Sequence, residues 1–200
     1  GWNMQEGPFN RVDWRADEFN HYVEVIRYMI QKYDVEVCLM SHSNGFDLSP
    51  YFNLKKGRDY PIVKQLYDLL CHTEVATNVF LLNGVYSPAV TKGIISHFDM
   101  LISGRVHAAV AGLSQSVPTV IIDYGHEPKA HKLRGFAEVA GVEAYVADPA
   151  DIQELKEKVD VCWNNRMLIN STLQNRNKII REMVHHNFDL LKEMYERKRL

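Results

Sequence analysis

The residues best suited to chemistry in this chain are Arg105 and His107, two positions apart in the run Ser103-Gly104-Arg105-Val106-His107. An arginine guanidinium is a planar fork that matches a phosphate or a carboxylate. A histidine can donate or accept a proton near neutral pH. An apolar run precedes this segment and an alanine-rich run follows it. The pattern predicts a strand, a sharp turn at Gly104 and the first turn of a helix, where exposed amides attract anions.

A second group of candidate side chains follows the next predicted strand. The segment Tyr124–Lys132 contains Lys129 and Lys132, and either lysine could neutralise a second anionic oxygen beside Arg105. The residue pattern does not choose between the two lysines, and the segment could equally be a solvated basic loop.

His42 lies in a third candidate loop, Ser41-His42-Ser43-Asn44, which follows an apolar run at residues 35–40. At a strand end this histidine could line the same pocket as Arg105, whereas many loop histidines are only structural.

Several other classes of site do not fit the sequence. His107, His126 and His131 lack the spacing of metal ligands and have no cysteine partners, so we expect no metal site. The three cysteines form no CxxC pair, which argues against a disulfide framework or a zinc knot. No GxSxG, GxGxxG or P-loop pattern occurs. The net charge of -2 does not favour nucleic acid or an anionic membrane as a partner, and no apolar run is long enough for a membrane span.

The elements that must position these residues alternate along the chain. Continuous apolar runs predict strands at 35–40, 78–82, 99–103, 119–123 and 143–147, with helices between them. This order predicts a doubly wound parallel α/β sheet, in which ligands bind outside the carboxyl ends of the strands. We assign residues 1–165 to one Rossmann-like α/β domain and residues 166–200 to a long C-terminal helix, which packs on that domain or extends from it.

The stretch NVFLLNGVYSPAVTKGIISHFDMLISGRVHAAVAGLSQSVPTVIIDYG resembles the C-terminal half of polysaccharide pyruvyl transferases. Their pattern has a strand, an R-x-H junction, an alanine-rich helix and a second strand ending in tyrosine. A lysine and, nine residues later, a glycine follow, as Lys132 and Gly141 do here. The loop around His42 is similar to the family's strand-end Pro-His, although Ser41 replaces the proline. The resemblance covers about residues 20–150.

The resemblance implies the donor-binding half of a GT-B-like enzyme of cell-surface and exopolysaccharide synthesis. Such enzymes move pyruvate from phosphoenolpyruvate onto a pair of sugar hydroxyls as a ketal, without a metal or another cofactor. By match, Arg105 and His107 are catalytic residues that hold the donor. His107 protonates the enol carbon or acts as a general acid. The substrate-binding residues that it implies are Ser103, Gly104, Tyr124, His42 and Lys132, with Lys129 competing for the lysine role because the intervening loop is longer than usual.

Further expectations follow from the resemblance and from two competing hypotheses. It implies a preceding N-terminal domain, with the site for a glycan or lipid-linked sugar acceptor in the cleft between the two domains. It also implies a cytoplasmic protein that contacts the membrane through this acceptor. The sequence does not decide whether the protein forms a homo-oligomer.

One competing hypothesis is a glycosyltransferase or sugar-nucleotide epimerase half-domain that binds a nucleotide diphosphate. The other is a non-catalytic binding module whose long helix mediates contacts.

Overall fold

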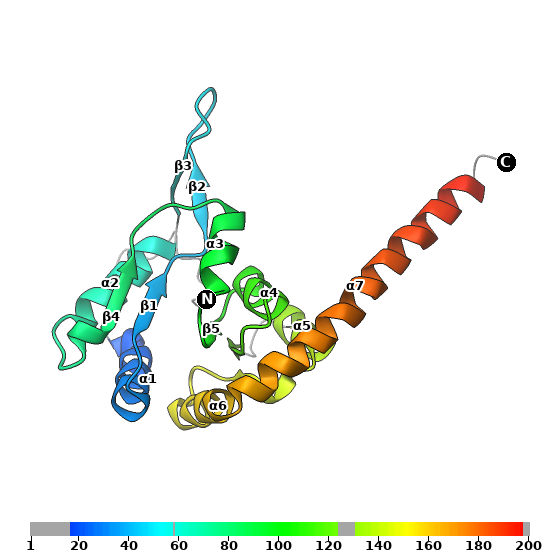
Figure 1. Ribbon diagram of the computed structural model, residues 1–200. Coiled ribbons are helices and arrows are strands. Elements are labelled where there is room, and N and C mark those ends of the chain that lie inside the picture. Colours follow the sequence, from blue (N-terminus) through cyan, green and yellow to red (C-terminus); the bar gives the residue numbers. More distant parts are fainter. Residues whose placement is uncertain (1–16, 58, 124–130, 198–200) are drawn as a thin grey trace.

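The computed structural model describes residues 17–57, 59–123 and 131–197, and Figure 1 shows their arrangement. Helices and strands alternate along most of the chain, as the sequence predicts. The helices are α1 (Asp17–Tyr33), α2 (Asp59–Leu70), α3 (Pro88–Ile95), α4 (Val106–Ser114), α5 (His131–Ala140), α6 (Ile152–Asn164) and α7 (Arg166–Arg197), with short 3-10 turns η1 (Ala76–Asn78) and η2 (Glu143–Tyr145). The strands are β1 (Val37–Met40), β2 (Asn44–Phe46), β3 (Leu54–Lys56), β4 (Val79–Leu82), β5 (Leu101–Ser103), β6 (Thr119–Ile122) and β7 (Val146–Ala147).

The parallel strands form two separate sheets within the described residues. β1 pairs with β4, and β5, β6 and β7 pair in that order. The predicted parallel pairing and the long C-terminal helix are therefore confirmed. The single doubly wound sheet is not, because β1 and β5 share no ladder and the side chains of both strands line a cleft.

Two local expectations are corrected by the structure. The polar loop predicted after the first strand contains an antiparallel hairpin, β2–β3, with Asn44 opposite Lys56 and Phe46 opposite Leu54. The strand predicted at 143–147 is reduced to the two residues of β7. The amide of Tyr145 donates to the carbonyl of Val142 at 3.0 Å, so the preceding residues form the 3-10 turn η2 instead of extending the sheet.

Helix α1 joins the two sheets because successive positions on it face different cores. Val25 and Met29 pack in the larger core cluster with α4, α5, α6 and β6. Ile26 and Ile30 pack in a second cluster with α2, β1 and β4. Neighbouring helical residues point about 100° apart, so one helix can contribute to both cores.

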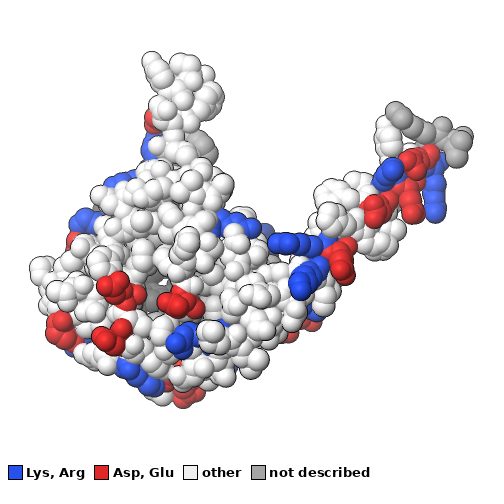
Figure 2. Space-filling model, in the orientation of Figure 1, with Lys and Arg blue, Asp and Glu red and all other residues white. Residues whose placement is uncertain are grey.

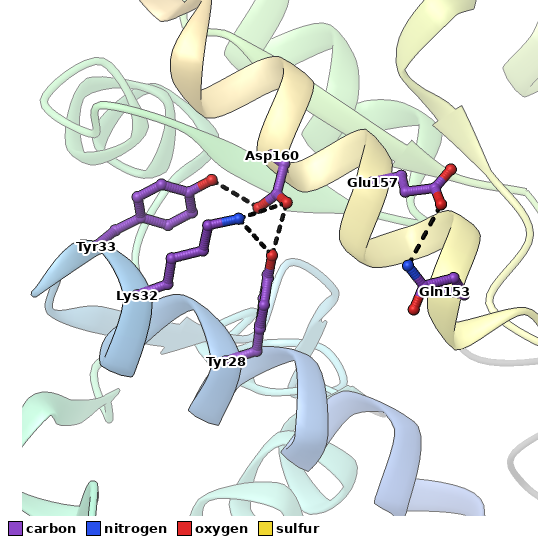
Figure 3. Close-up of polar contacts among 6 residues, drawn as sticks. All are labelled: Tyr28, Lys32, Tyr33, Gln153, Glu157 and Asp160. Carbon is purple, nitrogen blue, oxygen red and sulfur yellow. Dashed lines mark hydrogen bonds and ion pairs between the residues drawn. The ribbon is translucent and has the colours of Figure 1, made fainter.

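A polar network also fastens α1 to α6, as Figure 3 shows. The carboxylate of Asp160 on α6 accepts hydrogen bonds from Tyr28 (2.6 Å), Lys32 (2.7 Å) and Tyr33 (2.6 Å) on α1. Burial alone would raise the pKa of Asp160. The hydrogen bonds from Lys32, Tyr28 and Tyr33 outweigh this effect and hold the pKa below its ordinary value of 3.8.

Replacing Asp160 with asparagine should lower the free energy of unfolding at pH 7 by about 1.5 kcal/mol, because charge-assisted hydrogen bonds between α1 and α6 are lost. Since the folded-state pKa lies below the unfolded value, the wild-type contribution is complete above pH 3.8 and is lost as the pH falls through the folded pKa. Urea unfolding at pH 7 and pH 3 measures both effects. Glu157→Gln on the exposed side of α6 is the matched control and should change stability little. Equal losses in the two variants would contradict the prediction.

Only the first part of helix α7 packs against the described residues that precede it, which we call the body. The rest of the helix projects away from the body (Figure 1). Ile169 and Leu173 are buried, and Asn170 and Asn177 donate to the carbonyls of Ser116 and Leu113. Every residue from 181 to 197 is exposed. None of the described helices is both long and apolar enough to cross a membrane.

Candidate functional site

The junction between β5 and α4 is the centre of the candidate site. Ser103 is buried at the end of β5, and its Oγ accepts a hydrogen bond of 3.1 Å from the amide of Arg105. Arg105 has extended backbone angles and is the N-cap of α4. The predicted strand, turn and helix are confirmed, with the difference that Arg105 precedes the helix, whereas His107 lies in its first turn.

Small residues bring α4 close to the strands behind it. Ala108, Ala109 and Ala111 are buried against the sheet. A side chain at Gly112 would lie 2.8 Å from both Leu101 and Thr119. The position therefore requires glycine, and this close packing fixes the start of α4 at the carboxyl edge of β5.

Asp59 is a site residue that the sequence reasoning missed. It begins α2, is 8% exposed and forms an ion pair with Arg105. Its second carboxylate oxygen accepts a hydrogen bond of 3.1 Å from the amide of Ser43. The carboxylate therefore fixes the guanidinium of Arg105 against the loop that follows β1.

The base of the β2–β3 hairpin holds the neighbouring loops in place. A Cβ at Gly57 would lie 1.9 Å from the carbonyl oxygen of Ser43, so only glycine allows this approach next to Asp59. Asn44 donates to the carbonyl of Tyr86 at 2.7 Å, which ties the hairpin to the loop after β4. The loops that follow β1 and β4 therefore meet beside the Arg105–Asp59 pair.

His42 lies in the cleft beside the same pair. Its Nδ1 is buried and has no hydrogen-bond partner within the described part of the chain. Burial lowers the pKa of His42 below its ordinary value. Asp59 acts in the opposite direction, and the charges of His107 and Arg105 lower the pKa further. A neutral imidazole in this place can accept a proton or a hydrogen bond from a bound molecule.

The cleft has a volume of about 910 Å³ and carries different charges at its two ends. At the carboxyl ends of the strands it is lined by His42, Asp59, Ser103, Gly104 and Arg105. At their amino ends it is lined by the three acidic residues Asp34, Glu36 and Asp99, and Arg166 at the start of α7 also lines the cleft. Figure 2 shows acidic side chains grouped around a hollow in the face drawn. Carboxylates repel an anion, so an anionic ligand is expected at the Arg105 end.

The remaining predicted site residues are not brought into this cleft by the described structure. His107 is exposed and is not among the cleft-lining residues, although its charge acts on His42. Lys132 is exposed on α5 and does not line the cleft either. Tyr124 and Lys129 lie outside the described residues. Among the described residues, no group of histidine, cysteine and carboxylate side chains is arranged to hold a metal ion.

A family model described as polysaccharide pyruvyl transferase matches residues 8–126, more than half of the chain. The chain belongs to the polysaccharide pyruvyl transferase family. The match includes His42, Asp59 and the β5–α4 junction, so the site built from the geometry lies inside the region shared with the pyruvyl transferases. Lys132 lies beyond the matched region. The search of curated proteins and the search of solved structures each found no match.

Membership in the pyruvyl transferase family confirms the resemblance described above and indicates a transferase. Asp59 carried no sequence signal of its own, since it is separated from Arg105 by 46 positions and has the sequence context of an ordinary acidic residue at a helix start.

Proposed function

We propose that this protein transfers the pyruvyl unit of phosphoenolpyruvate to a pair of hydroxyls on a sugar, forming a cyclic ketal and releasing phosphate. The observation that carries the proposal is the partly buried Arg105–Asp59 pair at a strand-to-helix junction, inside the region matched by the pyruvyl transferase family. Phosphoenolpyruvate is a compact polyanion with one phosphate and one carboxylate. A preorganised guanidinium beside helix amides is suited to such a ligand.

In the proposed donor complex, Arg105 binds an anionic group of phosphoenolpyruvate and Asp59 keeps the guanidinium oriented. The amides at the start of α4 add partial positive charge at the same place. Gly104 lets the donor approach the backbone, since it has no side chain. The family resemblance proposes Lys132 for a further donor oxygen, with Lys129 as the alternative.

The proposed reaction forms two carbon–oxygen bonds to the central carbon of the donor, and it breaks the carbon–carbon double bond and the carbon–oxygen bond to phosphate. His107 is exposed two residues after Arg105 and does not line the cleft, so its proposed role requires its side chain to turn toward the bound donor. It then protonates the methylene carbon, which becomes a methyl group, and the first sugar hydroxyl attacks the central carbon. The second hydroxyl then replaces the phosphate on that carbon. One hydroxyl proton replaces the proton given by His107, and the other leaves with the phosphate. His42 is suited to accept a hydroxyl proton because its lowered pKa keeps it neutral at pH 7.

The proposed acceptor is a glycan or a lipid-linked sugar of polysaccharide synthesis, and the proposed location is the cytoplasm. The family description supports a saccharide acceptor. In this proposal the acceptor hydroxyls reach the donor carbon at the Arg105 end of the cleft, and a preceding domain would contribute the rest of the acceptor site.

Thermal unfolding with added ligands tests the donor assignment. Phosphoenolpyruvate should raise the unfolding midpoint more than equal concentrations of pyruvate or inorganic phosphate, because only the donor presents both anionic groups in one molecule. The shift should disappear in Arg105→Ala and persist in Lys92→Ala, which removes a cation that does not line the cleft. Equal shifts with phosphate and phosphoenolpyruvate would contradict the proposal.

A further inference from the structure

The part of α7 that leaves the body has an apolar stripe with no partner among the described residues. Figure 1 shows this part of the helix standing clear of the sheets, and Leu191 and Met194 on it are 61% and 60% exposed. The 18 residues from 180 to 197 span about 27 Å. A stripe of this length is larger than the scattered apolar side chains of an ordinary surface.

The stripe follows a strict spacing of four and three residues. Its members are Leu173, Asn177, Ile180, Val184, Asn187, Leu191 and Met194, so five of the seven positions are apolar and two are asparagines. This is the period of a helix that packs lengthwise against another helix. The first two members already contact the body, since Leu173 is buried and Asn177 donates to the carbonyl of Leu113. The same face is therefore covered by the body up to residue 177 and lies uncovered beyond it.

We propose that α7 pairs with the α7 of a second copy of this chain, in antiparallel orientation. The charge distribution fits this pairing. Residues 176–181 carry three basic side chains and no acidic one, whereas residues 189–196 carry three acidic and one basic. Antiparallel pairing sets the basic start of one helix against the acidic end of the other.

The position of the body selects this orientation over a parallel one. The body lies on the stripe side of α7 at residues 173–177, so two parallel helices facing each other would bring both bodies to the same place. Antiparallel helices place the two bodies at opposite ends, and each free helix end lies next to the partner's body. An anionic membrane is a poorer match for this helix, since acidic side chains balance the basic ones over residues 178–197.

The mass in solution tests the pairing. Light scattering after size exclusion should give twice the monomer mass of 23.1 kDa. Val184→Glu combined with Leu191→Glu should raise the dissociation constant of the dimer by at least about a hundredfold, because each interface would bury unpaired carboxylates. The matched control is Leu48→Glu with Phe52→Glu at the exposed tip of the β2–β3 hairpin, which should remain dimeric. Circular dichroism and thermal unfolding should show that both double variants stay folded.

Disulfide crosslinking tests the orientation in a background where the exposed Cys71 is replaced by serine. Ile180→Cys mixed with Met194→Cys should crosslink, whereas Ile180→Cys alone should not. A monomeric wild-type chain at its highest soluble concentration, or a dimer that survives the α7 double variant, would overturn the pairing. Efficient crosslinking of Ile180→Cys alone would overturn the antiparallel orientation. None of these readouts depends on phosphoenolpyruvate, so their failure leaves the proposed function untouched.

Discussion

Arg105→Ala should weaken phosphoenolpyruvate binding about a hundredfold, because a charge-assisted fork to an anionic group is lost from a partly buried site. Arg105→Lys should weaken it about tenfold, since the charge remains and the planar geometry does not. The buried carboxylate of Asp59 and the amides of α4 cannot replace the guanidinium. Equilibrium dialysis with labelled phosphoenolpyruvate measures both affinities.

Arg166→Ala is the matched control for this prediction. Arg166 also lines the cleft, but it stacks on Trp163 at the α6–α7 junction and not at the β5–α4 junction. Its removal should change the affinity less than twofold if only the Arg105 end binds the donor. A larger loss in Arg166→Ala than in Arg105→Ala would place the donor at the wrong end of the cleft for the proposed reaction.

Asp59→Ala should lower the free energy of unfolding by about 3 kcal/mol, because it leaves the guanidinium of Arg105 without its buried counter-ion. The side chains of Arg105 and Asp59 are 18% and 11% exposed, so water compensates little for the loss. The amide of Ser43 also loses its acceptor. Asp59→Asn should lower the free energy of unfolding by a smaller amount, since the amide oxygen of asparagine can still accept the hydrogen bond from Ser43.

Chemical denaturation of Asp59→Ala and of Asp68→Ala measures this difference on one helix. Asp68 pairs with Lys64 on the exposed side of α2 and is 52% exposed. Asp68→Ala should lower the free energy of unfolding by no more than about 0.5 kcal/mol. If both aspartates have the same effect, the Asp59–Arg105 pair has no special role in fixing the site.

The core of the candidate site could be predicted because its signals are local. Gly104 interrupts an apolar run, and the small residues that follow it predict a helix that packs closely, which the burial of Ala109 and Gly112 confirms. The start of α3 is equally local, since Pro88 is its first residue and Ser87 accepts a hydrogen bond from the amide of Val90. Such features depend on neighbouring residues alone.

The parts that could not be predicted depend on contacts between distant segments. The ion pair of Asp59 with Arg105 arises only when the start of α2 meets the turn after β5. The hairpin strands β2 and β3 are three residues each, which is too short for an alternating pattern to appear. The separation of β1 from β5 is a property of packing around α1, since the apolar runs of both strands are compatible with one sheet or two.

Isothermal titration calorimetry with phosphoenolpyruvate and with a uridine diphosphate sugar tests whether the Arg105 end of the cleft is a donor site. Phosphoenolpyruvate should bind at one site per chain, its binding should be lost in Arg105→Ala, and the nucleotide sugar should give no binding heat. Binding of the nucleotide sugar without binding of phosphoenolpyruvate would contradict this assignment and favour a glycosyltransferase half-domain.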